Sequence, residues 1–238
     1  MLRLLDFYFT DQNGQKSSDY HMIFEEYPMI ELGQKQYDSV EIPGRGTLML
    51  DTDTHSDTII TFIVDVNVMT SADARVKAYL DARSLLVGLK TISFCDASEY
   101  FYRVKSVSLG AVEQYSEIAG DFEVQLTCEP TLYLQSGTKQ YDAAGVADNP
   151  YSVCHPVYII TGEGVCTLTV NGKTMKANVA QNLTIDTERM LAYRTDGTMQ
   201  NAAVAGKYED LYLKSGKNEV SVTAGFMLKI IPNWGYLL

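Results

Sequence analysis

The stretch DFEVQLTC, residues Asp121–Cys128, alternates polar and apolar side chains along its whole length. A period of two is typical of a half-buried β-strand. Four side chains of this stretch should therefore share one buried face: Phe122, Val124, Leu126 and Cys128. The runs TIITFIVDV (Thr58–Val66) and YFYRVKSV (Tyr100–Val107) are rich in β-branched and aromatic residues. Together the three runs predict a mostly β fold.

One segment, Ser71–Leu89, departs from this alternation and predicts a single α-helix. Its larger apolar side chains recur at roughly helical spacing: Val76, Tyr79, Leu80, Leu86 and Val87. Ser71 is a suitable N-cap, and Asp73 lies in the first turn, where the helix dipole favours a carboxylate. Gly88 suits the C-terminal end of the helix.

The region from Cys128 to His155 is rich in turn residues and poorly periodic, which is typical of a connection between domains. We therefore expect two domains, residues 1–131 and 132–238, with the connection within about 131–154. Beyond it, short alternating strands resume at a spacing of roughly 8–12 residues, which indicates a β-sandwich. Asn171-Gly172 is a strong signal for a tight hairpin turn.

The composition argues against two classes of partner. The 238 residues carry a net charge of −11, from 30 acidic and 19 basic side chains, and contain no run of Lys or Arg. Direct binding to nucleic acid is not expected, because phosphate recognition needs a basic surface. Anionic membrane surfaces would repel such a chain.

The N-terminal MLRLLDFYF is interrupted by Asp6 and lacks a cleavage site, so we expect synthesis in the cytoplasm without a signal peptide.

The four cysteines are far apart and form no C-x-x-C pair: Cys95, Cys128, Cys154 and Cys166. Four cysteines allow two disulfides in three connectivities. We favour four structural thiols, since disulfides rarely persist in a reducing cytoplasm.

Two segments resemble ligand sites. Gly172-Lys173-Thr174 matches the end of a phosphate-binding loop, but Thr167 stands where that loop needs glycine, so a hairpin turn is favoured. The run from Asp51 to Asp57 contains carboxylates and His55, which are competent metal ligands. It fails the pattern of a calcium loop at three positions, so we expect a solvated loop or edge strand, with an adventitious cation as the alternative.

Catalytic chemistry is not indicated anywhere in the chain. The three histidines, His21, His55 and His155, have no metal-ligand spacing, and no nucleophile elbow is present. We predict no catalytic residue, no cofactor and no metal, and hence no enzyme.

The sixteen tyrosines and Trp234 fit either protein interfaces and cores or stacking on carbohydrate. Trp234 is the candidate packing or interface anchor.

The order of these segments resembles the distal tail (Dit) proteins of siphophages that infect Gram-positive bacteria. The first half carries the resemblance in IPGRGTL (Ile42–Leu48), the strand around Ile60–Val64, the single helix, and the segments Ile92–Phe94, Tyr100–Tyr102 and Phe122–Pro130. The second half adds Asn149-Pro150, His155-Pro156, Ile160–Gly162, Val170–Gly172, Ile185–Thr187, Leu213–Asn218 and Ile231–Gly235.

Two features depart from that resemblance. Family members often carry an acidic residue in the turn where Gly46 directly follows Arg45. A sugar-binding galectin needs a His-x-Asn-Pro-Arg strand, whereas His155 here precedes Pro156. It also needs Trp-Gly-x-Glu-x-Arg, which the chain lacks after Trp234. A galectin-like shape therefore does not imply galectin-like binding.

The resemblance implies a structural protein of the phage tail tip or baseplate hub. Residues 1–131 would form a β-sandwich-like ring domain with one α-helix, and residues 132–238 a galectin-like β-sandwich. It implies a hexameric homo-oligomer in the virion, assembled in the host cytoplasm. The implied partners are the tail tube protein, the tail-associated protein and a receptor-binding protein. The alternative is a carbohydrate-binding adhesion protein that uses its second domain on the host cell wall.

Overall fold

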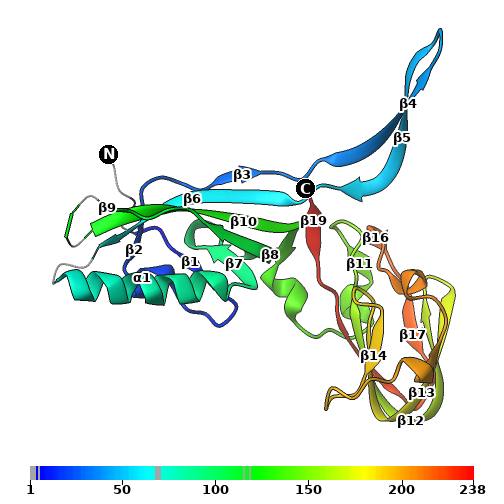
Figure 1. Ribbon diagram of the computed structural model, residues 1–238. Helices are drawn as coiled ribbons and strands as arrows, with labels where there is room; N and C mark the ends of the chain where they lie inside the picture. The colour runs from blue at the N-terminus through cyan, green and yellow to red at the C-terminus, as the bar shows by residue number, and fades with distance from the viewer. Residues whose placement is uncertain (1–3, 5, 68–70, 115, 118) are drawn as a thin grey trace. The chain divides into compact units, whose positions relative to one another are not determined.

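The computed structural model describes residues 4, 6–67, 71–114, 116–117 and 119–238. Part of the N-terminal MLRLLDFYF stretch lies outside the described residues. The chain separates into two compact units. The first unit comprises Met1–Leu132 with Leu237–Leu238, and the second comprises Tyr133–Tyr236. The described residues are mostly β with one α-helix, so the expected fold class is confirmed (Figure 1).

Strands dominate the first unit. They are β1 (Phe9–Thr10), β2 (Met22–Phe24), β3 (Met29–Glu31), β4 (Lys35–Ile42), β5 (Gly46–His55), β6 (Thr58–Asn67), β7 (Thr91–Phe94), β8 (Tyr100–Leu109), β9 (Glu113–Gln114) and β10 (Ala119–Leu134). The helices are α1 (Ala72–Val87) and the short 3-10 helices η1 (Ser17–Tyr20) and η2 (Cys95–Ala97). β10 runs past Leu132, so it also supplies the first residues of the second unit.

One curled sheet forms most of the first unit, with strand order β1-β7-β8-β10-β6-β2. β3 adds to β6, while β9 and β19 (Gly235–Leu237) add to β10. β6 and β10 pair antiparallel over ten residues, from Ala119 opposite Asn67 to Cys128 opposite Thr58. Two of the three runs that predicted the fold are therefore direct neighbours. The backbone N–H of Leu238 also donates to the carbonyl of Pro130 at 2.8 Å.

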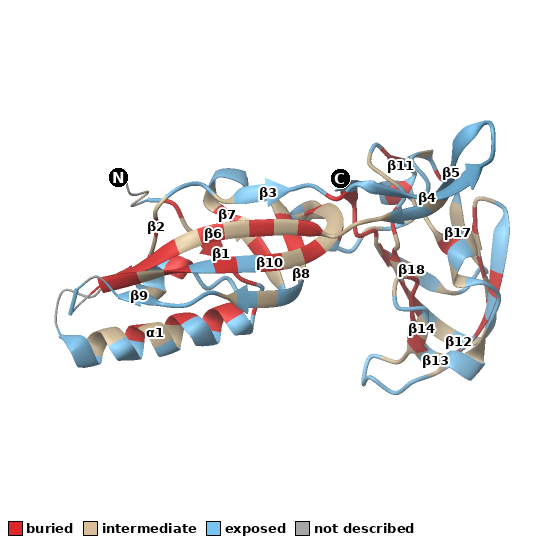
Figure 2. Cartoon of the chain, turned by 45° about the horizontal axis from the view of Figure 1, so that its top comes forward, coloured by how far each residue is buried: buried red, intermediate tan, exposed pale blue. Residues whose placement is uncertain are grey.

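The core of the first unit lies between α1 and the inner face of this sheet (Figure 2). The four residues predicted to share one face of β10 are all buried: Phe122, Val124, Leu126 and Cys128. Phenylalanines pack around them, and Phe24 has its ring centroid 5.1 Å from that of Phe62. Burying such side chains stabilises a fold by about 1.5–3 kcal/mol each, so this layer holds the sheet and helix together.

The ends of α1 agree with the prediction. The Ser71 side chain accepts a hydrogen bond from the Ala74 N–H at 3.2 Å, and the Gly88 N–H closes the last turn on Leu85 and Ser84 carbonyls. The buried face differs from the one that the apolar spacing suggested, because Leu86 is the only one of the five predicted residues that is buried. Four residues face the sheet: Ala78, Ala82, Leu85 and Leu86. Small alanines let the helix approach the sheet closely, and this leaves other apolar side chains exposed: Val76, Leu80 and Val87.

The second unit has a separate six-stranded sheet. Its strands are β12 (Val157–Val170), β13 (Lys173–Asp186), β14 (Leu191–Tyr193), β15 (Val204–Ala205), β17 (Val220–Val222) and β18 (Met227–Ile231). β11 (Asp148–Asn149) and β16 (Gly216–Lys217) form a small second sheet. The 3-10 helices are η3 (Gln135–Thr138), η4 (Ala144–Val146), η5 (Asn201–Ala203) and η6 (Tyr208–Leu211). Tyr158 is fully buried in the core of this unit, and its hydroxyl donates to the Leu211 carbonyl at 2.7 Å.

The tight turn between β12 and β13 forms where it was predicted. Asn171 and Gly172 both have positive φ, 50° and 78°, which is the backbone of a type I′ hairpin turn. Val170 pairs with Lys173 across it. Gly172-Lys173-Thr174 therefore lies at a hairpin, and the chain there does not enter a helix whose N–H groups could hold a phosphate.

Candidate assembly surfaces

The hairpin β4–β5 is exposed along most of its length. Its two strands pair only with each other, and none of the residues from Lys35 to His55 is buried. Figure 2 shows both strands coloured almost entirely as exposed. Gly44 and Gly46, with φ of 79° and 83°, form the turn at its tip. An isolated two-stranded hairpin is only marginally stable in water, so we expect this hairpin to pack against a partner.

The register of this hairpin gathers apolar side chains on one face. Val40 pairs with Leu48, Ile42 with Gly46, and Asp38 with Leu50. Residues paired across an antiparallel ladder point to the same side. Four side chains, each 37–48% exposed, therefore form what we term the apolar hairpin face: Val40, Ile42, Leu48 and Leu50. An exposed apolar face of this kind is a candidate surface for protein contact.

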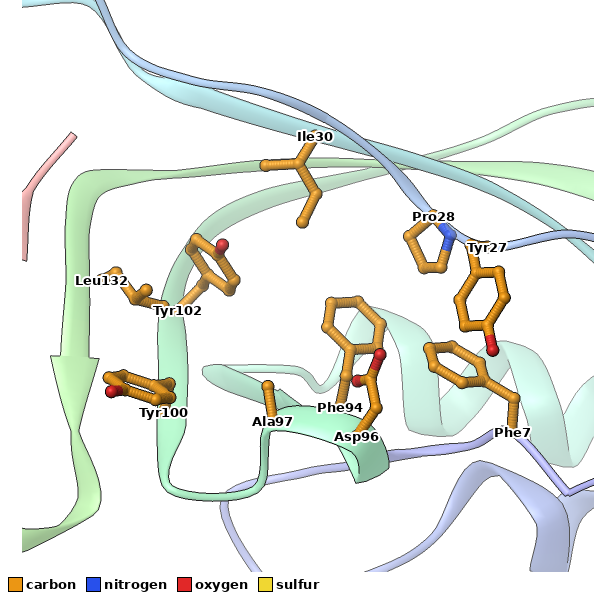
Figure 3. Close-up of a pocket in the computed structure, with 10 residues that line it drawn as sticks. All are labelled: Phe7, Tyr27, Pro28, Ile30, Phe94, Asp96, Ala97, Tyr100, Tyr102 and Leu132. Atoms are coloured by element: carbon orange, nitrogen blue, oxygen red, sulfur yellow. The ribbon is translucent and has the colours of Figure 1, made fainter.

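A second feature of the first unit is a cavity of about 190 Å³, which we term the aromatic pocket. Five aromatic residues and one carboxylate line most of it: Phe7, Tyr27, Phe94, Tyr100, Tyr102 and Asp96. Figure 3 shows Tyr100, Tyr102 and Leu132 on one side of an open space, with Pro28, Tyr27 and Phe7 on the other. On the same measure one water needs roughly 10–15 Å³, so the pocket has room for a larger group.

Packing among the rings fixes the walls of the aromatic pocket. Phe7 and Phe94 stack with ring centroids 5.7 Å apart, and Tyr27 meets Phe7 edge-on at 5.1 Å. Burial raises the pKa of the Tyr102 hydroxyl, with a smaller contribution from Cys128. The neutral phenol can therefore act as a hydrogen-bond donor over the whole physiological range. The walls suit a group that stacks on rings and carries polar hydrogens or charge.

A groove of about 540 Å³ runs between α1 and β8. Leu80, Val87 and Val112 contribute apolar side chains that are 52–62% exposed, and Arg83 is the charged residue of its lining. Two of the three exposed apolar residues of α1, Leu80 and Val87, therefore line this groove. It is an open surface that suits contact with another protein.

Trp234 lies in the core of the second unit and is 9% exposed. Its ring centroid is 5.0 Å from that of Tyr141 and 5.8 Å from that of Tyr151. The Trp234 carbonyl accepts from the Leu134 N–H at 2.9 Å. Its indole N–H is buried and has no hydrogen-bond acceptor among the described residues. Trp234 therefore offers little surface for stacking on a sugar.

The acidic run from Asp51 to Asp57 does not form one regular strand face. Asp53 has a φ of 54°, and the pairing register shifts opposite it, so the alternation is interrupted. Asp51 pairs with Lys35 and Asp57 with Lys105. Hydrogen bonding to Lys35 lowers the pKa of Asp51. Cationic side chains thus already neutralise two of these carboxylates. Within the described part of the chain, no three His, Cys, Asp or Glu side chains gather as a metal site.

The histidines and cysteines, all of them among the described residues, do not gather into one site. His21 ends η1, His55 ends β5, and the His155 ring lies 4.3 Å from that of Tyr212. All four cysteines are free, and three of them are buried: Cys128, Cys154 and Cys166. Burial raises the pKa of Cys128 and that of Cys154, each to about 12. These thiols are therefore un-ionised and unreactive at neutral pH.

Sequence reasoning missed the two most distinctive surfaces. The aromatic pocket joins residues from four distant segments, so no local pattern marks it. The apolar hairpin face does have a signal, the alternation of Val40 with Ile42 and of Leu48 with Leu50 around a Gly-rich turn. That pattern equally describes a buried strand pair, which is why exposure could not be read from it.

Fold and surfaces together define a mostly β, two-unit protein whose first unit carries an exposed apolar hairpin and two cavities. Among solved structures, the chain is similar to the SPP1 Dit protein, described as a paradigm of the hub adsorption apparatus in phages that infect Gram-positive bacteria. The TM-score is 0.61 at 12% identity, covering 94% of this chain and 97% of that one. It is also similar to a chain of the phage p2 baseplate in its activated conformation, with a TM-score of 0.51 at 12% identity. That match covers 97% of this chain and 98% of the other.

Neither sequence comparison adds to these structural matches. No protein-family model matches the chain, and the search of curated proteins finds no significant match. Among the helices of the described residues, none is both long and apolar enough to span a membrane.

Proposed function

We propose that this chain is a non-catalytic structural hub protein of a phage tail tip or baseplate. The observation that carries the proposal is the fold similarity to the SPP1 Dit protein over 94% of this chain and 97% of that one. Similarity over nearly the whole of both chains spans residues of both units. The expected siphophage resemblance in the sequence points the same way.

The surfaces of the first unit support assembly into a ring. The apolar hairpin face and the two apolar concavities are different surfaces of one chain. Contact between unlike surfaces of identical copies is heterologous, and it closes into a ring when the rotation between copies allows. We take the hexameric number from the family resemblance.

In this arrangement the first unit forms the ring between the tail tube protein and the tail-associated protein. The second unit carries the receptor-binding protein by protein contact. The protein is then a component of the virion, assembled in the host cytoplasm. Its role is to join and position the other tail components, so it needs no catalytic group.

Light scattering on the purified chain over a range of concentrations tests self-assembly. We expect an oligomer whose mass is several times the 26.5 kDa of one chain, and we expect rings in negative-stain images. The double variant Val40→Thr and Leu48→Thr keeps β-formers in the hairpin but makes its apolar face polar, so it should shift the mass toward the monomer.

A matched control changes the opposite face of the same hairpin. Ser39 and Thr47 do not belong to the apolar hairpin face. The double variant Ser39→Thr and Thr47→Ser should therefore assemble like the unmodified chain. A monomer mass for the unmodified chain at every concentration would contradict ring formation.

A further inference from the structure

The tip of the β4–β5 hairpin presents a cation next to the apolar hairpin face. Arg45 lies between Gly44 and Gly46 and is exposed. Its backbone N–H donates to the Ile42 carbonyl at 3.0 Å, which closes the turn. Among the described residues, no ion pair or side-chain hydrogen bond engages its guanidinium. The hairpin therefore carries an unpaired guanidinium at its tip.

The aromatic pocket has the complementary chemistry. Aromatic faces attract a cation through their quadrupole, and the attraction is stronger where water is excluded. Asp96 supplies a carboxylate in the pocket lining, and no ion pair of the described residues engages it. A guanidinium suits both walls, because it is planar enough to stack on a ring and can donate two hydrogen bonds to one carboxylate.

The charges next to the pocket residues in sequence are also acidic. Exposed carboxylates adjoin three of the aromatic residues in sequence: Asp6, Glu26 and Glu99. The basic residue adjoining Tyr102 is Arg103, which forms an ion pair with Glu129 at 3.8 Å. A cationic ligand would thus enter a region of negative charge, which favours association.

From these two features we infer that Arg45 of one copy inserts into the aromatic pocket of a second copy. Within one chain Arg45 does not line the pocket, so the pocket is open to the hairpin tip of another copy. Ile42 and Leu48 flank the tip and would lie against the pocket mouth, where Ile30 is 39% exposed. The inference deepens the proposed ring, since it names the residue and the pocket that join neighbouring copies.

A charge-swap experiment on the full-length chain tests this contact. Arg45→Glu and Asp96→Lys should each raise the concentration at which half of the chain is assembled by at least tenfold. In a homo-oligomer the double variant restores opposite charges at every contact, so it should assemble within a few-fold of the unmodified chain. Arg45→Lys keeps the charge but loses the planar fork, and should give an intermediate value.

The control for net charge is Glu163→Lys, an exposed charge reversal in the second unit, which should leave assembly unchanged. The inference is overturned if Arg45→Glu assembles like the unmodified chain. It is equally overturned if the double variant is no better than the worse single variant. Either result would leave the proposed ring in place and move its contact elsewhere.

If the unmodified chain remains monomeric, the proposed ring fails, and the pocket is tested separately with acetyl-Gly-Arg-Gly-amide. Saturable NMR shifts of the Tyr100 and Tyr102 rings that are lost with Asp96→Lys would support the pocket as an arginine site. No saturable shift, or an equal response to acetyl-Gly-Glu-Gly-amide, would overturn it.

Discussion

The rings of Trp234 and Tyr141 lie 5.0 Å apart at an interplanar angle of 41°, inside the second unit. The two residues are more than ninety positions apart in sequence, and Tyr151 completes the cluster. We propose that Trp234 is a packing anchor of this unit. Trp234→Ala should then destabilise the second unit by about 3–5 kcal/mol, because it leaves a large cavity. Thermal unfolding measures the loss, and Trp234→Phe should cost much less.

The carbohydrate-binding alternative makes the opposite prediction for the same variant. It expects normal stability of Trp234→Ala and lost adsorption to host cell walls. Adsorption of the purified variant to cell walls, measured beside its melting temperature, separates the two. Unchanged melting with abolished adsorption would contradict the packing role and favour glycan binding.

Two glycines of the second unit should differ in their sensitivity to substitution. At Gly172 a Cβ would meet no atom within 4 Å, but φ is +78°, so Gly172→Ala should cost about 1–2 kcal/mol from backbone strain. At Gly137 a Cβ would lie 2.5 Å from the backbone N of Trp234, so Gly137→Ala should cost more. Denaturant unfolding gives both values. Lys173→Ala is the control at the same turn and should be close to neutral.

The buried thiols predict a loss of stability at alkaline pH. Burial raises the pKa of Cys128 from 9.0 to about 12, so the folded state holds its proton more tightly than the unfolded state. This contribution is fully present below pH 9 and is lost as pH rises toward 12, by about 1.4 kcal/mol per pH unit. Melting temperatures measured under reducing conditions should be flat below pH 9 from this cause. Cys128→Val should show a shallower alkaline decline, and an unchanged decline would argue against the thiol.

The N-cap of α1 gives a prediction for the first unit. Ser71→Ala removes the hydrogen bond to the Ala74 N–H and should cost about 1 kcal/mol. Ser71→Asp should retain most of the stability, because aspartate caps equally well. Ser84→Ala is the matched control on the exposed side of the same helix, and should be neutral or slightly stabilising. Equal effects of the two alanine variants on denaturant unfolding would contradict the role of the cap.

Local patterns predicted the parts of the fold that local physics decides. The alternation around Phe122 follows from a strand with one buried face, and the limits of α1 follow from Ser71 and Gly88. The hairpin turn at Asn171-Gly172 follows from the positive φ that both residues tolerate. These features depend on residues within a few positions of one another, so the sequence alone is sufficient to place them.

Features that depend on distant residues could not be predicted in the same way. The spacing of the apolar residues placed Leu80 on the face of α1 that we expected to be buried. The face that packs on the sheet instead carries Ala78 and Ala82, and Leu80 is exposed. The aromatic pocket needs Phe7, Tyr27 and Tyr100 brought together by tertiary pairing. Periodicity shows that one face of a helix or strand is apolar. It does not show whether the same chain or a partner covers that face.

The hydrogen bond from Leu238 to Pro130 bears on how such a protein can evolve. The chain leaves the first unit after Leu132 and returns to it at Leu237, and next to these two points Leu238 is hydrogen-bonded to Pro130. The second unit is thus an insert whose two ends meet at one place. Recombination could replace the whole insert with another fold of similar end spacing, while the first sheet keeps its strands. Under the proposed function, a tail could acquire a new adhesion module as a single cassette without redesigning the ring.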